Sequence, residues 1–62
     1  PGPLGAARVA WHREKLAELR GYLAEARGAE GYQRSERTLL AGIAYHEKML
    51  EMLELLAQAR AA

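Results

Sequence analysis

The chain has 62 residues, with nine basic and eight acidic side chains, a net charge of +1 and no cysteine. This length allows one small domain at most, and because disulfides are excluded, oligomerisation is the expected route to stability. The even charge balance argues against a free-standing nucleic-acid or membrane-surface binder, which would show a face of one sign.

The first six residues, PGPLGA, contain two prolines and two glycines, so we expect an irregular segment, either a tag remnant or a linker. The domain proper is expected over 7–62, with a first helix over about 7–28. The residues along its apolar side, which we call its seam, follow one another at alternating intervals of three and four positions. This is the heptad pattern of a helix that packs against one partner. The seam residues are Val9, His12, Leu16, Leu19, Leu23 and Ala26.

A turn over about 28–32 follows, because the GAEG sequence offers Gly28 as a left-handed helix C-cap. The second helix is expected over about 33–60, with Ser35 as its N-cap. The connection is too short for anything but an antiparallel pair, so the fold class is all-α, a two-helix hairpin.

The second helix carries two apolar seams. One matches the seam of the first helix, and the other is displaced by about 100° around the axis. A single partner helix covers only one seam, so we expect the hairpin to dimerise, most simply as a two-fold symmetric four-helix bundle. The predicted hairpin core is Val9, His12, Leu16, Leu19, Leu23, Leu39, Ile43, His46, Leu50 and Leu53. The predicted dimer interface is Trp11, Tyr22, Gly42, Tyr45, Met49, Met52 and Leu56.

Charged residues flank the seams of both helices. In an antiparallel pair these edges face each other, which predicts Arg13 near Glu54 and Arg20 near Glu47. Each exposed pair is worth only about 0–1 kcal/mol, so the pairs align the helices more than they stabilise them. Simple solvation of these charges is the alternative.

His12 and His46 are the only candidates for metal binding or catalysis. Neither has a usual ligand three or four residues away, and the two lie about one layer apart, so we expect them to converge only across a dimer. We therefore predict no metal, no cofactor and no catalytic residue, and interpret both as packing histidines. A pH-sensitive interface is the open alternative. With one serine, one threonine and no glycine-rich phosphate loop, the chain is not expected to be an enzyme.

The segments WHREKLAELRGYLAEAR and ERTLLAGIAYHEKMLEML resemble the C-terminal helical domain of PadR-type transcriptional regulators over about residues 8–58. In that family a histidine–arginine–acid cluster opens the first helix. The second helix carries a glycine–isoleucine pair followed by an aromatic, here Gly42, Ile43 and Tyr45. Met52 stands where the family often has tryptophan, and the family's winged-helix DNA-binding domain is absent from this sequence.

The resemblance implies a homodimer that serves as the dimerisation domain of a bacterial transcription regulator. Such a domain reaches DNA only through a domain not present here, and an unknown small-molecule effector stays open. The alternatives are a stand-alone helical adaptor that binds another protein through the Tyr45/Met49/Met52/Leu56 face, a ligand-binding bundle, and the dimerisation coil of a MerR-type regulator. The GAEG break favours a hairpin over one continuous coil. We expect a cytoplasmic protein without membrane contact, because no apolar run approaches roughly 18 residues.

Overall fold

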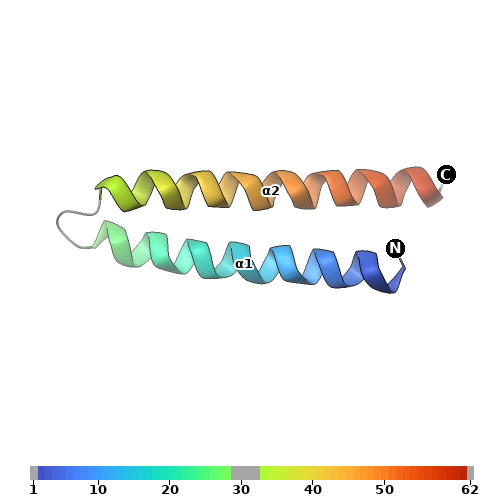
Figure 1. Ribbon diagram of the computed structural model, residues 1–62, viewed down its shortest axis with the longest axis horizontal. Helices are drawn as coiled ribbons and strands as arrows, with labels where there is room; N and C mark the ends of the chain where they lie inside the picture. The colour runs from blue at the N-terminus through green and yellow to red at the C-terminus, as the bar shows by residue number, and fades with distance from the viewer. Residues whose placement is uncertain (1, 29–32, 62) are drawn as a thin grey trace.

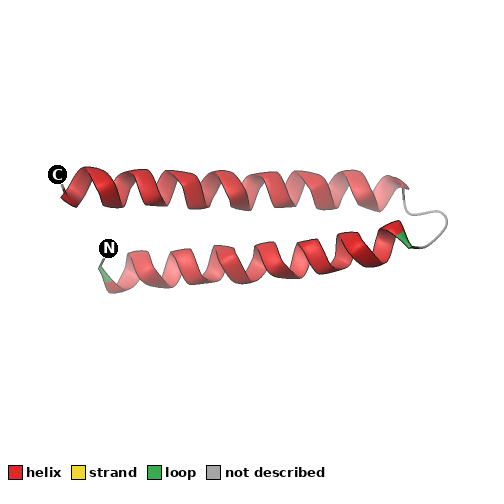
Figure 2. Ribbon diagram, turned by 180° about the vertical axis from the view of Figure 1, so that it is seen from behind, coloured by secondary structure: helices red, strands yellow, loops and turns green. Residues whose placement is uncertain are grey.

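The computed structural model describes residues 2–28 and 33–61, and within them it shows two α-helices and no strand (Figure 1). Helix α1 spans Pro3–Arg27 and helix α2 spans Gln33–Ala61. They lie side by side and run in opposite directions, so the start of α1 and the end of α2 lie at one end of the hairpin (Figure 2). The all-α antiparallel hairpin predicted from the heptad spacing is confirmed.

Helix α1 begins at Pro3, four residues earlier than expected, so the expectation of an irregular segment over 1–6 is wrong from Pro3 onward. Proline suits a first helical position because its φ is already fixed near −65° and its missing N–H has no helical partner there. Gly2 precedes it in an extended conformation, with φ −67° and ψ 176°. The backbone N–H of Ala6 donates to the carbonyl oxygen of Gly2 at 3.0 Å, so helical hydrogen bonding starts at once.

The described ends of the connection differ from expectation in two details. Gly28 caps α1, but in a right-handed conformation with φ −86° and ψ −2°, so the predicted left-handed cap is wrong. Its N–H donates to the carbonyl oxygen of Glu25 at 3.1 Å, which tightens the last turn and satisfies that carbonyl without a left-handed residue. Helix α2 already begins at Gln33, so Ser35 lies in its first turn and is not the N-cap. The rest of the predicted turn lies outside the described residues.

The core is a single line of side chains between the two helices. Leu16, Leu23 and Ile43 are buried at its centre, and other leucines pack against them. All ten residues predicted for the hairpin core are buried or half-buried. None of the described side chains falls below 2 % exposure, because each helix has a partner on one side only.

Gly42 belongs to the contact between α1 and α2. A Cβ atom added at Gly42 would lie 3.0 Å from Cδ1 of Leu19, so the missing side chain lets the two helices approach at this point. The neighbour that approaches Gly42 here is thus in the same chain, and its place in a dimer interface stays a prediction. Gly42 lies between the two seams of α2. Because it has no side chain, Leu19 of α1 can come close to the backbone of α2 at this position.

The hairpin is long and thin, measuring 49 × 15 × 12 Å. Its radius of gyration is 14.5 Å, where a compact domain of this length has about 11 Å. Its accessible surface is 5053 Å², where a compact monomer of this mass exposes about 4,000 Å². Neither α1 nor α2, over the residues described, is long and apolar enough to cross a membrane.

Candidate functional site

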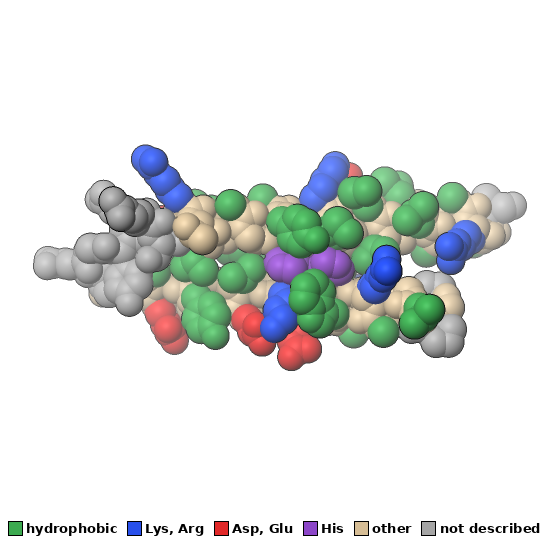
Figure 3. Space-filling view, in the orientation of Figure 1, with side chains coloured by type: hydrophobic (Ala, Val, Ile, Leu, Met, Phe, Trp, Pro, Cys, Tyr) green, Lys and Arg blue, Asp and Glu red, His purple; other side chains and the backbone are tan. Residues whose placement is uncertain are grey.

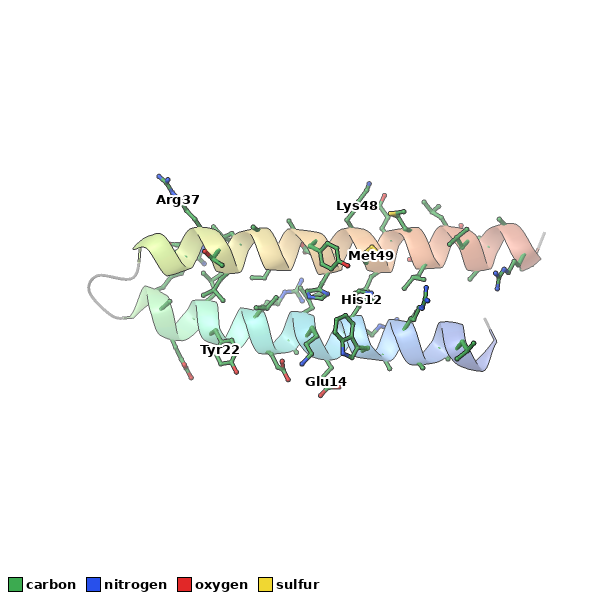
Figure 4. The ribbon with its side chains drawn as sticks, in the orientation of Figure 1. His12, Glu14, Tyr22, Arg37, Lys48 and Met49 are labelled. Atoms are coloured by element: carbon green, nitrogen blue, oxygen red, sulfur yellow. The ribbon has the colours of Figure 1, made fainter. Side chains whose placement is uncertain are left out.

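The two histidines meet halfway along the hairpin. Nδ1 of His12 lies 2.8 Å from Nδ1 of His46, although the residues are 34 positions apart in sequence. Both side chains are buried, at 5 % and 9 % exposure, and His12 is labelled between the helices in Figure 4. The expectation that they converge only across a dimer is wrong. One layer of a helix pair is about 5 Å deep, a distance that two imidazole side chains can bridge.

The short Nδ1–Nδ1 contact fixes where the protons lie. One Nδ1 must donate and the other must accept, so the two rings hold complementary tautomers. None of the buried side-chain nitrogen and oxygen atoms in the described residues lacks a hydrogen-bond partner. The two Nε2 atoms have no protein partner there, so solvent reaches them. The Nδ1 atoms are therefore paired between the helices, and the Nε2 atoms point to the solvent side.

Two aromatic rings pack edge-on against the pair. The Trp11 ring centroid lies 4.9 Å from that of His12 and 5.5 Å from that of His46. The Tyr45 ring lies 4.9 Å from His46 and 6.1 Å from His12. The ammonium group of Lys15 lies 5.9 Å from the Trp11 ring. Trp11 and Tyr45, predicted for the dimer interface, thus flank the histidines while their outer sides stay exposed.

Hydrophobic and basic side chains surround the histidine pair on one side of the hairpin. Figure 3 shows this side, with the histidines between the helices and hydrophobic side chains on both helices around them. Helical rotation of about 100° per residue puts the predicted interface residues of both helices, Gly42 apart, on this side. We call it the aromatic face and define it as Trp11, Tyr22, Tyr45, Met49, Met52 and Leu56. All six are exposed except Met49, which is half-buried.

Ion pairs close the opposite side of the hairpin. The predicted pair of Arg20 with Glu47 is confirmed, with Nη2 lying 3.2 Å from Oε2. Nε of Arg27 lies 2.9 Å from Oε1 of Glu36, which joins the last turn of α1 to the first turn of α2.

The second predicted pair, Arg13 with Glu54, is wrong, because the ion pairs formed by the described residues do not include it. Both side chains line an open groove near the free ends of the helices, where water can solvate each charge separately.

Leu4 is a surface residue that the sequence analysis missed. It is the most exposed of the large hydrophobic side chains and lines the same groove as Leu56, which extends the apolar surface toward the free ends of the helices. The composition of PGPLGA hid it, since two prolines and two glycines predict a loop. The proline position just after Gly2 was the available signal for a helix start.

The arrangement of the pair is that of a hydrogen bond and differs from that of a metal site. A tetrahedral zinc ion holds nitrogen ligands at 2.0–2.1 Å and so separates two of them by about 3.3 Å. The observed 2.8 Å is instead a hydrogen-bond distance. Within the described parts of the two helices, no three histidine, cysteine or acidic side chains gather as a metal site. Comparisons of the chain with protein-family models, with curated proteins and with solved structures find no match.

Proposed function

We propose that this chain is a dimerisation module that pairs with a second copy of itself through the aromatic face. The observation that carries the proposal is that large apolar side chains from both helices lie exposed on one side of the hairpin. Single exposed hydrophobic residues are ordinary, but a contiguous set on one side of a small protein is typical of an interaction surface.

The surface area of the hairpin supports this proposal. Its 5053 Å² exceeds the area expected of a compact monomer by roughly 1,000 Å². A stable interface takes about 800 Å² from each partner, so pairing of two hairpins along one side would remove this excess. Trp, Tyr and Met, which make up most of the aromatic face, are also the residues enriched where proteins associate.

The distribution of charge supports the aromatic face over the other sides. The interhelical ion pairs lie on the opposite edge, where Arg20 contacts Glu47 and Arg27 contacts Glu36. A partner that covered that edge would have to desolvate two interhelical ion pairs, whereas the ion pair beside Trp11 on the aromatic face is the intrahelical one of Lys15 with Glu18. Two hairpins packed in this way form a four-helix arrangement.

The wider role that we propose is the dimerisation of a transcriptional regulator of the PadR type. It is supported by the sequence resemblance, which includes the Gly42–Ile43 pair and Tyr45. In such a protein the hairpin would hold two DNA-binding domains at a fixed separation.

The test compares two matched pairs of substitutions by light-scattering chromatography. Met52→Glu/Leu56→Glu puts two charges on the aromatic face, at positions 47 % and 57 % exposed. Leu40→Glu/Leu55→Glu adds the same charges at positions 43 % and 56 % exposed, outside that face.

We expect a dimeric parent, a monomeric Met52/Leu56 variant that keeps its helical circular dichroism, and a dimeric Leu40/Leu55 variant. A folded, monomeric parent would refute self-association and would favour an adaptor that binds a different protein through this face. Equal weakening by both double variants would refute the choice of face.

A further inference from the structure

The histidine pair lies in the middle of the aromatic face. Trp11 and Tyr45 contact it directly, Met52 and Leu56 follow toward the free ends of the helices, and Tyr22 lies toward the turn. We infer that dimerisation brings the histidine pairs of two copies opposite each other, and that this four-imidazole centre makes association depend on pH. The inference rests on the proposed function.

Symmetry supports the meeting of the two pairs. Two hairpins can stack face to face about a two-fold axis that runs either along the hairpin or across it. Rotation about an axis parallel to the helices leaves each residue at the same position along the hairpin. Because the pair lies midway between the two helices, the pairs of the two copies then face each other. An axis across the hairpin gives the largest apolar overlap when it passes through the middle of the face, which again is where the pair lies.

The hydrogen bond within each pair limits how many protons the pair can hold. A neutral pair needs an N–H on one Nδ1 and a lone pair on the other, and one added proton at Nε2 leaves this bond in place. A second added proton puts an N–H on both Nδ1 atoms, so that two hydrogens and two like charges meet across 2.8 Å. The doubly protonated pair must therefore open.

The surroundings do not compensate the added charge. The described ion pairs include no contact between a carboxylate and either imidazole. Glu47 is bound to Arg20, and Lys15 is bound to Glu18. The charged residues nearest to the pair in sequence are Arg8, Arg13, Glu14 and Lys15 on α1 and Glu47 and Lys48 on α2. Tyr45, which contacts His46, is uncharged when its hydroxyl is protonated.

The dimer would add a second pair and remove water from the Nε2 atoms, so it disfavours each added charge more strongly than the free hairpin does. The sign of the effect follows. Association is complete where the pairs are neutral and is lost as the pH falls and the imidazoles bind protons. If each protomer takes up one more proton on dissociation, the dissociation constant rises about 100-fold per pH unit on the acid side.

The dissociation constant of the parent would be measured by light scattering at about pH 8 and about pH 5, on either side of the range in which histidine titrates. The matched variant is His12→Gln/His46→Gln, which keeps a donor and an acceptor at both positions but cannot titrate. We expect the parent to dissociate in acid with its helices retained, and the variant to show the same dissociation constant at both values.

A parent whose dissociation constant is unchanged between the two pH values would overturn the inference and leave the proposed dimer intact. A parent that is monomeric at both would remove the proposed function as well. If the double variant fails to fold, the histidine titration of the parent, followed by NMR at two protein concentrations, decides the matter. A midpoint that rises on dilution supports the inference, and identical curves refute it.

Discussion

A double-mutant cycle on the histidine pair tests whether the hydrogen bond between the two rings holds the hairpin together. The variants are His12→Leu, His46→Leu and the two changes combined. Each single change leaves the Nδ1 of the other, nearly buried ring without a partner. An unsatisfied buried polar atom costs about 1–3 kcal/mol, less the small gain from the added leucine. Both single variants should therefore unfold more easily than the parent.

The combined change should cost less than either single change, because no Nδ1 is left unpaired and two leucines continue the heptad seams. The expected coupling is at least about 1 kcal/mol. Urea unfolding followed by circular dichroism measures it, at about pH 8 and one fixed protein concentration, since dimerisation makes the midpoint depend on concentration. If the double variant loses the sum of the two single effects, the rings do not depend on each other and the reasoning is refuted.

Two further comparisons use matched positions in the same chain. Gly21→Ala should raise the free energy of unfolding by about 1 kcal/mol, because nothing lies within 4 Å of the added Cβ. Gly42→Ala should raise it less, or lower it, because its Cβ would meet Leu19 at 3.0 Å; equal gains would contradict the close helix contact. Arg20→Gln should cost at most about 1 kcal/mol and less at high salt, whereas Arg13→Gln should change little, as thermal unfolding at two salt concentrations would show.

The heptad spacing predicted the hairpin because the alternation of three and four residues leaves a helix one way to bury its apolar side chains. It also predicted the alignment that joins Arg20 to Glu47. The spacing of the residues was thus enough to place the matching seams of the two helices on the core side. The backbone differs from the expectation at the two ends of α1 and at the start of α2, where Ser35 is already helical.

The histidine contact and the place of Gly42 could not be read from the spacing. A heptad assignment sorts residues into layers about 5 Å apart, but it ignores the reach of a side chain, and two imidazoles from neighbouring layers can touch. Gly42 lies at the boundary between two seams, where the angle around the helix does not decide which neighbour comes closer. The distance to Leu19 decides it, and that distance depends on how both helices pack.

The histidine pair explains how a hairpin with so thin a core keeps one alignment. Leucines along a heptad seam would pack almost as well after a slip of seven residues, and exposed ion pairs resist such a slip only weakly. A slip of one heptad would set His12 against Leu39 or Leu53 and leave both rings unpaired. The Nδ1–Nδ1 bond therefore selects the alignment, as a polar residue in a coiled-coil seam does. The same alignment puts Trp11 of α1 and Tyr45 of α2 against the same two imidazole rings, so that the aromatic face takes residues from both helices.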